Sequence, residues 1–371
     1  MDFVQFVISL QSSTGRNDMS RTVRVGIIGA GGIARWAHIP GYQAQPDVEL
    51  AAICDVAPGK AAQVAKECNI AHAYDSMSEM LKKEKLDAVS VCTPNASHHE
   101  ATLAALAAGC HVLCEKPIAM NLAEGREMVA AAHAAGKTLQ IGLQSRFESE
   151  TQVLKRFVEA GELGEIYYAE ATYMRRRGIP GWGVFTQKKF QGGGALIDIG
   201  VHTLDQTLWL MGNPRPVAVM GATWEAFGHR PEVVSEGQHW DASKFDVDDM
   251  GVGLVRFANG AMLYLRASWA ANIEKSYGEQ KLLGTLGGAS KSPLKIYTER
   301  HGALVDITPT GLPEVKAHFK EIEHFVACVR GETACMVVPE QVLDVQAILD
   351  AIYESSRSGH EVRLDTPDDK A

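Results

Sequence analysis

The stretch VRVGIIGAGGIA, residues 23–34, joins a β-rich run to a glycine-rich turn and predicts the fold of the first half of the chain. It fits the pattern G-x-G-x-x-G/A, with alanine in the third fixed position. The first glycine of that pattern allows a tight turn, and the second lets the backbone approach a pyrophosphate at a helix N-terminus. The turn supplies five candidates for cofactor binding: Gly29, Gly31, Gly32, Ile33 and Ala34.

A carboxylate at the end of the next strand supports the same interpretation. The run 50–54 is followed by Asp55, which lies 26 residues after Gly29. A carboxylate there accepts hydrogen bonds from an adenosine ribose and repels a 2′-phosphate, so NAD is favoured over NADP. Lys60 is close enough in the sequence to keep NADP open.

Short β-rich runs alternate with helical stretches as far as about Gln144. Strands are predicted at residues 23–28, 50–54, 88–92, 111–114 and 138–141, with helices at 34–45, 59–69, 76–84, 97–108 and 122–135. Apolar strands separated by helices indicate a parallel sheet that is covered on both faces. We therefore expect a Rossmann dinucleotide-binding domain over residues 21–145, after a flexible tail at residues 1–20.

The second half has a different pattern, in which strands follow one another with hairpin signals such as Asn259-Gly260. Strands are predicted at residues 166–174, 216–224, 250–257, 261–269 and 279–283, with helices at 151–159, 195–210, 315–330 and 339–356. The expected fold class is α/β, with the Rossmann domain followed over residues 146–371 by an α+β domain. Its large, mostly antiparallel sheet is open on one face, and that domain is expected to bind substrate and to form oligomers.

Composition excludes several classes of protein. The 371 residues are 46% hydrophobic and 22% charged, which is typical of a soluble globular protein, and the net charge of −9 argues against a nucleic-acid partner. The sequence has no apolar run long enough to cross a membrane, and the apolar residues 3–10 lack the flanks of a signal peptide. Seven scattered cysteines without a C-x-x-C motif indicate a reducing compartment, so the cytoplasm is expected.

Polar residues follow the third and fourth predicted strands, at the sheet edge where ligands of open α/β folds collect. Lys116 lies between Glu115 and Pro117, where it would stand above the nicotinamide, although a lone lysine is usually a solvated surface residue. Candidates for contact with the cofactor in this region are Thr93, Pro94, Asn95, His98, Glu115, Lys116 and Gln144. The same polar residues also suit a turn with a helix cap. The pair His98-His99 lacks a third ligand, so no metal is expected.

A glycine run at residues 192–194 leads into a predicted helix that carries Asp198 and His202 among apolar neighbours. Residues four apart share a helix face, and charged groups on an apolar helix are costly unless they are paired or functional. The pair is therefore either structural or catalytic. Asp205, one turn further, is expected to be structural.

These motifs together resemble the Gfo/Idh/MocA oxidoreductase family from about Val23 to Arg363. The resemblance rests on GIIGAGGIA, TPNASH, EKP, GGGALIDIGVHTLD, FDVDD, NGAML, SWA and LLGTLGG. It implies a Rossmann domain followed by an α/β domain whose open sheet builds homodimers or homotetramers. It also implies NAD(P)-dependent oxidation or reduction of sugars and polyols, with Lys116, Asp198 and His202 as catalytic residues.

The resemblance further suggests residues that bind the substrate. Residues 173–183 are similar to members that act on glucosides, levoglucosan-like sugars and inositols, although a solvated basic loop would have the same composition. Aromatic and guanidinium groups suit a polyhydroxylated ring. The substrate candidates are Lys116, Arg146, Tyr173, Arg175, Trp182, Asp198 and His202.

The sequence thus predicts an NAD-dependent dehydrogenase acting on the CH–OH group of a sugar, inositol or glucoside. His202 is expected to be the general base, oriented by Asp198, and Lys116 to stabilise charge on the reacting oxygen. One alternative is an enzyme that retains NAD and cleaves or epimerises a glycoside through a transient keto sugar. Another is a regulator that binds NAD without catalysis.

Overall fold

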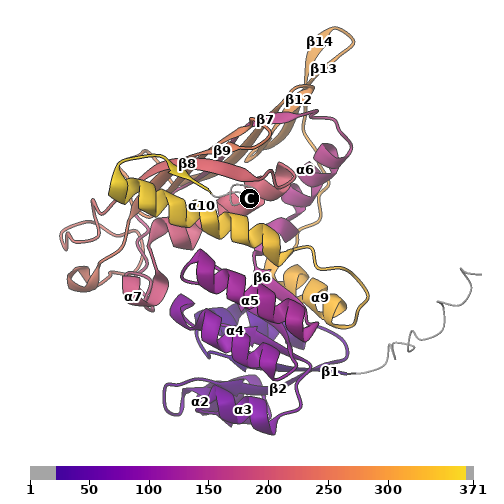
Figure 1. Ribbon diagram of the computed structural model, residues 1–371, viewed down its shortest axis with the longest axis vertical. Coiled ribbons are helices and arrows are strands. Elements are labelled where there is room, and N and C mark those ends of the chain that lie inside the picture. The colour runs from indigo at the N-terminus through magenta and orange to yellow at the C-terminus, as the bar shows by residue number, and fades with distance from the viewer. Residues whose placement is uncertain (1–21, 365–371) are drawn as a thin grey trace, which may run out of the picture.

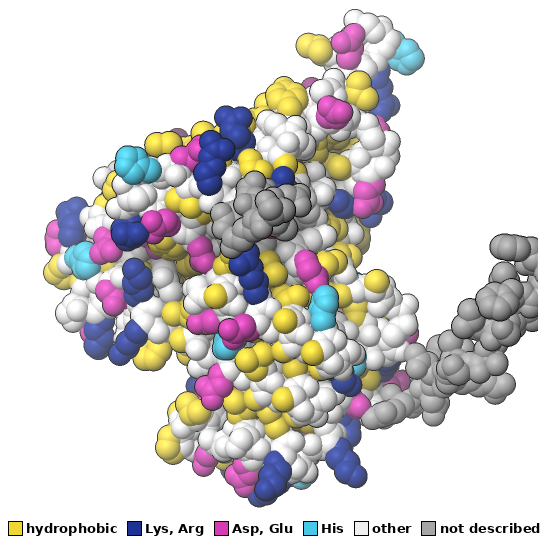
Figure 2. All heavy atoms as spheres, in the orientation of Figure 1, with side chains coloured by type: hydrophobic (Ala, Val, Ile, Leu, Met, Phe, Trp, Pro, Cys, Tyr) yellow, Lys and Arg dark blue, Asp and Glu magenta, His cyan; other side chains and the backbone are white. Residues whose placement is uncertain are grey.

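The computed structural model describes residues 22–364, so the tail predicted for residues 1–20 lies outside the described part. Two sheets organise the chain, and Figure 1 shows them one above the other with α5, α9 and α10 between them. On the face drawn in Figure 2, acidic and basic side chains are interspersed. Within the described residues, no helix combines the length and the apolar character needed to cross a bilayer.

The first sheet has six strands, and all of its strand pairs are parallel. Its order is β3 (His72–Tyr74), β2 (Val48–Cys54), β1 (Val23–Ile28), β4 (Ala88–Val91), β5 (His111–Glu115) and β6 (Leu139–Gly142). The helical segments of this half are η1 (Ala34–His38), α1 (Ile39–Gln43), α2 (Lys60–Cys68), α3 (Met77–Lys83), η2 (Asn95–Ser97), α4 (His98–Ala107), α5 (Leu122–Ala135) and η3 (Gln144–Phe147). The predicted Rossmann architecture is confirmed.

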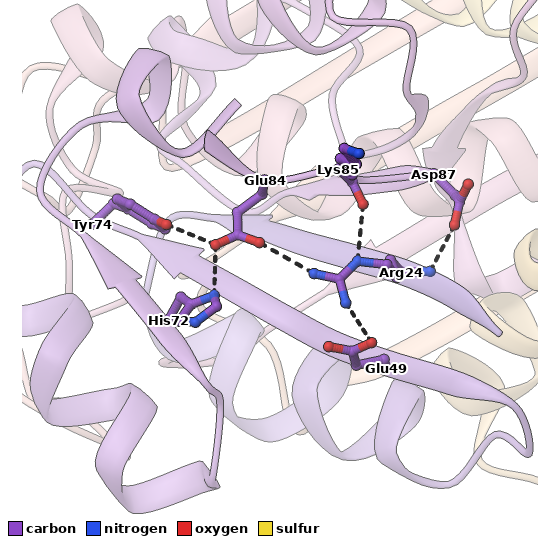
Figure 3. Close-up of polar contacts among 7 residues, drawn as sticks. All are labelled: Arg24, Glu49, His72, Tyr74, Glu84, Lys85 and Asp87. Atoms are coloured by element: carbon purple, nitrogen blue, oxygen red, sulfur yellow. Dashed lines mark hydrogen bonds and ion pairs between the residues drawn. The ribbon is translucent and has the colours of Figure 1, made fainter. Parts of the chain in front are cut away.

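The edge strand β3 was not predicted, because it is short and mostly exposed rather than apolar. Polar contacts hold this edge in place (Figure 3). Glu84 accepts hydrogen bonds from Tyr74 Oη at 2.7 Å and Arg24 Nη2 at 3.2 Å, and it pairs with His72 Nδ1 at 2.6 Å. Burial opposes ionisation of Glu84, but Tyr74, His72 and Arg24 outweigh it and hold its pKa below the usual value. A side-chain network therefore stabilises an edge that hydrophobic patterning does not reveal.

The second sheet has nine strands, of which only β7 and β10 pair in parallel. Its order is β14 (Ala303–Ile307), β13 (Leu294–Arg300), β12 (Gly287–Lys291), β11 (Tyr277–Gly284), β7 (Ile166–Met174), β10 (Met262–Ser268), β9 (Met250–Phe257), β8 (Pro216–Trp224) and β15 (Val362–Arg363). The helical segments are α6 (Ser149–Glu159), α7 (Lys188–Gln191), η4 (Leu196–Gly200), α8 (Val201–Leu210), η5 (Ala242–Lys244), α9 (Ala317–Val329) and α10 (Pro339–Ser358). The prediction of a large, mostly antiparallel sheet is confirmed.

Alternate residues of β9 and β10 point to opposite faces of this sheet, as a strand requires. The inner face carries Val255 and Leu263, both fully buried against the helices. On the outer face, Met220 and Leu254 are 57% and 42% exposed. That face is therefore open and partly apolar.

Helix α9 follows the second sheet in the chain but packs on the first. Its Ile322 and Phe325 are fully buried in one cluster with Val25 and Tyr42. A larger cluster runs from the first sheet through α10 to the second, so the two halves share buried packing. This arrangement holds the ends of β5 and β6 against η4 and α8.

Candidate active site

The turn after β1 has the geometry of a phosphate-binding loop. Gly29 has φ = +98°, and a Cβ there would lie 2.6 Å from the carbonyl oxygen of Cys92, so only glycine fits. At Gly31 an added Cβ would meet only Cys92 O at 3.9 Å, and at Gly32 nothing within 4 Å. The loop therefore offers open backbone at the start of a helical segment, which fits the pyrophosphate of a dinucleotide.

Asp55 lies beside this loop, as predicted. Its carboxylate accepts hydrogen bonds from Ala30 N at 2.8 Å and Ala57 N at 2.9 Å, and it pairs with Lys60 Nζ at 2.8 Å. Burial raises the pKa of Asp55, but Lys60 and the two amides lower it more, so the pKa is below the usual value. The side chain is an anion at the edge of the loop, with a lysine beside it.

Two predicted cofactor contacts, Thr93 and Asn95, lie in the loop after β4, and they differ in hydrogen bonding. Thr93 Oγ1 is buried and has no hydrogen-bond partner within residues 22–364, which leaves a polar atom available to a ligand. Asn95 is buried and donates from Nδ2 to Gln191 O at 2.9 Å, so it joins this loop to α7. Pro94, between them, is exposed.

The prediction that His98 contacts the cofactor is wrong. The ring is fully buried, and its two nitrogens lie 2.8 Å from Pro117 O and 3.1 Å from Thr93 O. Burial lowers the pKa of His98, and the two carbonyls only partly offset it. His98 therefore holds two ligand-facing loops together from inside the protein.

Lys116 and Asp198 meet where the two halves face each other. Lys116 Nζ donates to Asp198 Oδ1 at 2.8 Å and to Asp198 O at 2.7 Å, and both side chains are 15% exposed. The other carboxylate oxygen, Oδ2, accepts from Nε1 of the buried Trp269 at 3.0 Å. Burial opposes ionisation of Asp198, but Lys116 outweighs it, so the pKa of Asp198 lies below the usual value.

Residues 196–200 form one turn of π-helix rather than the predicted α-helix, and a second aspartate holds the start of that turn. Asp248 accepts hydrogen bonds from Gly194 N at 2.7 Å, Leu196 N at 2.9 Å and Tyr353 Oη at 2.6 Å. A Cβ on Gly194 would lie 1.8 Å from Asp248 O, so the close approach requires glycine. Helix α10, through Tyr353, thus fixes the segment that carries Asp198.

His202 has a different environment from the one predicted. Its Nδ1 is buried and has no hydrogen-bond partner among the described residues. The carboxylate oxygens of Asp198 accept from Lys116 and Trp269, and the described part of the structure shows no hydrogen bond through which Asp198 would orient His202 as predicted. Burial and the charge of Lys116 lower the pKa of His202 to about 3, so the imidazole is neutral at physiological pH.

A buried network lies behind Lys116. Glu115 Oε1 is 2.7 Å from His38 Nε2, and His38 Nδ1 is 3.1 Å from Ser90 Oγ, which also contacts Tyr42 Oη at 2.8 Å. Burial opposes ionisation of Glu115, but His38 and Lys116 lower its pKa to about 2. Glu115 was predicted to bind the cofactor. In the structure one of its two carboxylate oxygens is bonded to His38.

The prediction that Arg146 binds the substrate is wrong. Its side chain and that of Asp205 are both 0% exposed, with Nε and Nη2 donating to Asp205 at 3.0 and 2.6 Å. Arg146 Nη1 donates to Met336 O at 3.0 Å and to Gln341 Oε1 at 2.9 Å. A substrate cannot reach a guanidinium in this position. Asp205 has the structural ion pair that was expected for it.

The remaining substrate candidates lie at residues 173–182, and Gln144 is the last of the predicted cofactor contacts. Arg175 lies over the Tyr173 ring at 5.3 Å and donates to Gly178 O at 3.1 Å, and its charge contributes to lowering the pKa of Asp198. Trp182 is 53% exposed and contacts Phe185 edge to face. Gln144 is half-buried at the start of η3. Arg175 is thus the candidate whose charge reaches the Lys116–Asp198 pair.

Sequence reasoning missed Trp269, Asp248, Tyr353 and His38. Trp269 is 71 residues from the carboxylate that it binds, and Asp248 is 105 residues from Tyr353. Two adjacent acids, Asp248 and Asp249, in a stretch flanked by apolar residues were the available signal. Buried acids need partners, so this stretch was a place to look for a positioning role.

Comparison with known proteins agrees with the architecture. Residues 23–143 match a family model described as "Oxidoreductase family, NAD-binding Rossmann fold", and residues 155–364 match "Oxidoreductase family, C-terminal alpha/beta domain". Both family models describe an oxidoreductase, and together they cover most of the chain. The chain belongs to the Gfo/Idh/MocA oxidoreductase family.

Individual relatives give a finer comparison. D-glucoside 3-dehydrogenase of Escherichia coli K12 is 39% identical over 93% of this chain and 98% of its own length. Levoglucosan dehydrogenase of Pseudarthrobacter phenanthrenivorans is 27% identical over 72% of this chain and 73% of its own. A solved levoglucosan dehydrogenase in complex with NADH and levoglucosan has a TM-score of 0.80 at 22% identity, covering 93% of this chain and all of that one. The last likeness concerns the fold.

Proposed function

We propose that this protein oxidises a ring hydroxyl of a glucoside or related sugar with NAD as hydride acceptor. The observation that carries the proposal is the meeting of Lys116 Nζ and Asp198 Oδ1 at 2.8 Å, from the two halves of the chain and at the same edge of the parallel sheet as the dinucleotide loop. The 39% identity to a D-glucoside 3-dehydrogenase supports the substrate class. The bound cofactor would supply the nicotinamide that accepts the hydride.

In the proposed mechanism Lys116 binds the reacting oxygen. Its ammonium donates to Asp198 twice, which leaves one proton without a partner among the described residues. That proton would hydrogen-bond the substrate hydroxyl and stabilise negative charge as the C–H bond breaks. Asp198 holds the lysine in place, and Trp269 holds Asp198.

His202 is the proposed proton acceptor. Its Nδ1 is unpartnered, and its pKa of about 3 keeps the imidazole in the neutral form that a base needs. A base with so low a pKa accepts a proton best from an acidified hydroxyl, and hydrogen bonding to Lys116 would acidify the substrate. Lys116 and His202 would therefore act as a unit.

The loop geometry supports NAD as the preferred cofactor. Gly31 and Gly32 would hold the pyrophosphate, Thr93 would contact the nicotinamide half, and Asp55 would bind the adenosine ribose. Lys60 pairs with Asp55 and is 42% exposed, so it would moderate the repulsion of a 2′-phosphate. NADP use at a lower level is consistent with that ion pair.

We assign sugar recognition to Tyr173, Arg175 and Trp182. Of these three residues, Arg175 is the one whose charge lowers the pKa of Asp198. Its position over the Tyr173 ring fixes the direction of the guanidinium. An exposed indole such as Trp182 offers a flat apolar surface to the C–H face of a sugar ring. The division of the chain near residue 145 would place these residues in a substrate domain.

We further propose a homo-oligomer formed through the outer face of the second sheet, in the cytoplasm. Met220 and Leu254 are exposed and adjacent in register there, with the half-buried Met262 and Tyr264 on the neighbouring strand. Covering such apolar side chains stabilises an assembly. Light scattering at micromolar concentration tests this, and a monomer would exclude it.

All seven cysteines are free, which is consistent with a reducing compartment.

The decisive experiment is NADH formation by the purified protein across glucosides, hexoses, inositols and anhydrosugars. We expect a glucoside or related ring to give stoichiometric NADH and a keto sugar. An enzyme that retains its cofactor would give product without net NADH. Binding of NAD with no turnover on any substrate would instead indicate a regulator.

A further inference from the structure

A cluster of two cysteines and a histidine lies at the end of α9, outside the site described above. The ligand atoms of His324, Cys328 and Cys335 all lie within 4.8 Å of one another, and His324 Nε2 is 3.4 Å from Cys328 Sγ. Within residues 22–364 it is the one group of three or more side chains of this kind that converges so closely. Nothing in the proposed reaction uses it.

The local fold brings the three side chains together. His324 and Cys328 are four residues apart on α9 and therefore share one helix face. The chain turns back at Gly331, which has φ = +74°, and returns Cys335 to that face. Cys335 Sγ also contacts Val337 O at 3.2 Å and Gln140 Oε1 at 3.5 Å.

We propose that His324, Cys328 and Cys335 bind one thiophilic divalent cation of the Zn²⁺ class. Imidazole nitrogen and thiolate sulfur are the ligands that zinc prefers, and a tetrahedral site with bonds of about 2.1 and 2.3 Å places them about 3.5 Å apart. The N–S separation of 3.4 Å already meets that distance. Cys335 Sγ has to move by a side-chain rotation of modest size to complete the set.

His324 is in the protonation state that a metal ligand needs. Its Nε2 accepts a hydrogen bond from Met336 N at 2.8 Å, so Nε2 carries no proton and its lone pair is directed at that amide. The cation would replace that N–H as the partner of Nε2. One backbone hydrogen bond is exchanged for metal–ligand bonds that are much stronger.

A cavity of about 430 Å³ opens beside the cluster. His324 and Met336 line it together with Phe147, Gln152, Pro313 and Lys320. Because His324 lines this cavity, the cavity would give a cation a path from solvent to that ligand and room for a water as the fourth ligand. Three protein ligands and one water complete a tetrahedral site.

The position of the cluster indicates a bracing role rather than a catalytic one. Cys335 contacts Gln140 of the first sheet, and the next residue, Met336, accepts a hydrogen bond from Arg146. A cation here would link α9 to the segment that leads into α10. Its expected effect is on stability, with kcat unchanged.

The test uses the full-length chain, treated with a chelator and reduced with a phosphine. Zn²⁺ titrated by calorimetry should bind at one per chain, and Cd²⁺ should produce the ultraviolet thiolate charge-transfer band. Cys335→Ser, Cys328→Ser and His324→Ala should each weaken binding at least about 10-fold, since each removes one of three ligands. Cys68→Ser is the matched control, because Cys68 is half-buried at the end of α2 and should leave binding unchanged.

A second measurement needs no variant and covers the case in which one fails to fold. Zn²⁺ should protect Cys328 and Cys335 of the wild-type chain from alkylation, as mapped by mass spectrometry, without protecting Cys68. Absence of binding would overturn the proposal, as would affinity that survives loss of both cysteines. Recovery of the two thiols as a mutual disulfide, with no bound Zn²⁺, would also overturn it.

Discussion

Two ion pairs connect segments that follow strands of the first sheet to one helical segment of the second half, and they differ in exposure and in hydrogen bonding. Lys116, at the end of β5, bonds Asp198, and Arg146, just after β6, bonds Asp205 seven residues further along. The first pair is 15% exposed on both sides, and the second is fully buried. We call Lys116–Asp198 the open pair, because it is partly exposed, and Arg146–Asp205 the sealed pair, because it is fully buried.

The difference lies in what remains available to a ligand. Arg146 makes four hydrogen bonds, two of them to one carboxylate in the bidentate geometry that guanidinium favours. Lys116 keeps one ammonium proton free within the described part of the chain and lies beside the neutral His202. A catalytic site needs a donor that is still free to bind the substrate. An ion pair in which every donor already has a partner can only fix the relative position of two elements.

The largest expected effect comes from the open pair. Lys116→Ala should lower kcat by on the order of 10²–10⁴, the usual contribution of a positioned proton-transfer group, with only a small change in Tm. His202→Ala should lower kcat over the same range, with little change in the affinity for NAD. Steady-state kinetics on the best substrate and NAD titration measure these effects, with the exposed Lys83→Ala as control.

Asp198→Asn should also reduce kcat, because the amide no longer holds the charged lysine. The combined Lys116 and His202 variant should be far from additive if the two residues act as a unit. Retention of more than about half of the wild-type kcat by His202→Ala would exclude it as the base and would favour Lys116.

The sealed pair should respond in the opposite way. Asp205→Ala leaves the Arg146 guanidinium buried without its carboxylate, and loss of one partner of a buried pair typically costs about 3–5 kcal/mol. Urea unfolding should show this loss, while kcat per folded molecule should fall much less than for Lys116→Ala. An unaltered unfolding midpoint would mean that the pair does not stabilise the junction.

His202 provides a pH test of the open site. Its folded pKa of about 3 lies below the unfolded value near ~6.5, so the unfolded state binds the proton first. The free energy of unfolding should therefore be unaffected above about pH 6.5, and below it should fall by up to about 1.4 kcal/mol per pH unit. His202→Gln should reduce that slope between pH 6 and 4 in denaturant titrations, and identical slopes would contradict the assigned environment.

The smallest expected effect concerns Asp55 and Lys60, which form an ion pair. NAD should exceed NADP in kcat/KM by at least roughly tenfold, or about 1.4 kcal/mol, because the carboxylate faces the 2′-phosphate. Asp55→Ser should narrow this ratio, and Lys60→Ala should widen it, since Lys60 neutralises part of the Asp55 charge. Equal use of both cofactors by the wild type would contradict this assignment.

The sequence was sufficient where a local pattern determines the structure. The glycine turn, the ends of the parallel strands and the alternation of β9 and β10 depend on neighbours in the chain, so the first sheet apart from β3 and the strands β7 to β11 of the second sheet were predictable. Strand β3 was not, because it is three residues long, mostly exposed, and held by the contacts of His72 and Tyr74 with Glu84. The hairpin of β13 and β14 extends away from the core and lacks strong apolar alternation.

Partners distant in the sequence explain the errors in the site. Arg146 follows a strand end exactly as a ligand-binding residue would do, yet Asp205 and Gln341 lie 59 and 195 residues away. His98 follows another strand end, and its two acceptors are backbone carbonyls, which no side-chain motif reveals. The sequence pattern locates the edge of the parallel sheet where ligands bind. It does not show whether a side chain at that edge already has hydrogen-bond partners within the protein.

The return of α9 to the first sheet has a consequence for biosynthesis. The face that contains Val25 and Tyr42 is covered by Ile322 and Phe325, which the ribosome makes last among these residues. At about 5–20 residues per second, that face waits roughly 10–40 s after residue 145 for its cover. We therefore expect the nascent first half to expose this apolar face, and a fragment ending at residue 145 should bind a hydrophobic dye that the full-length chain does not.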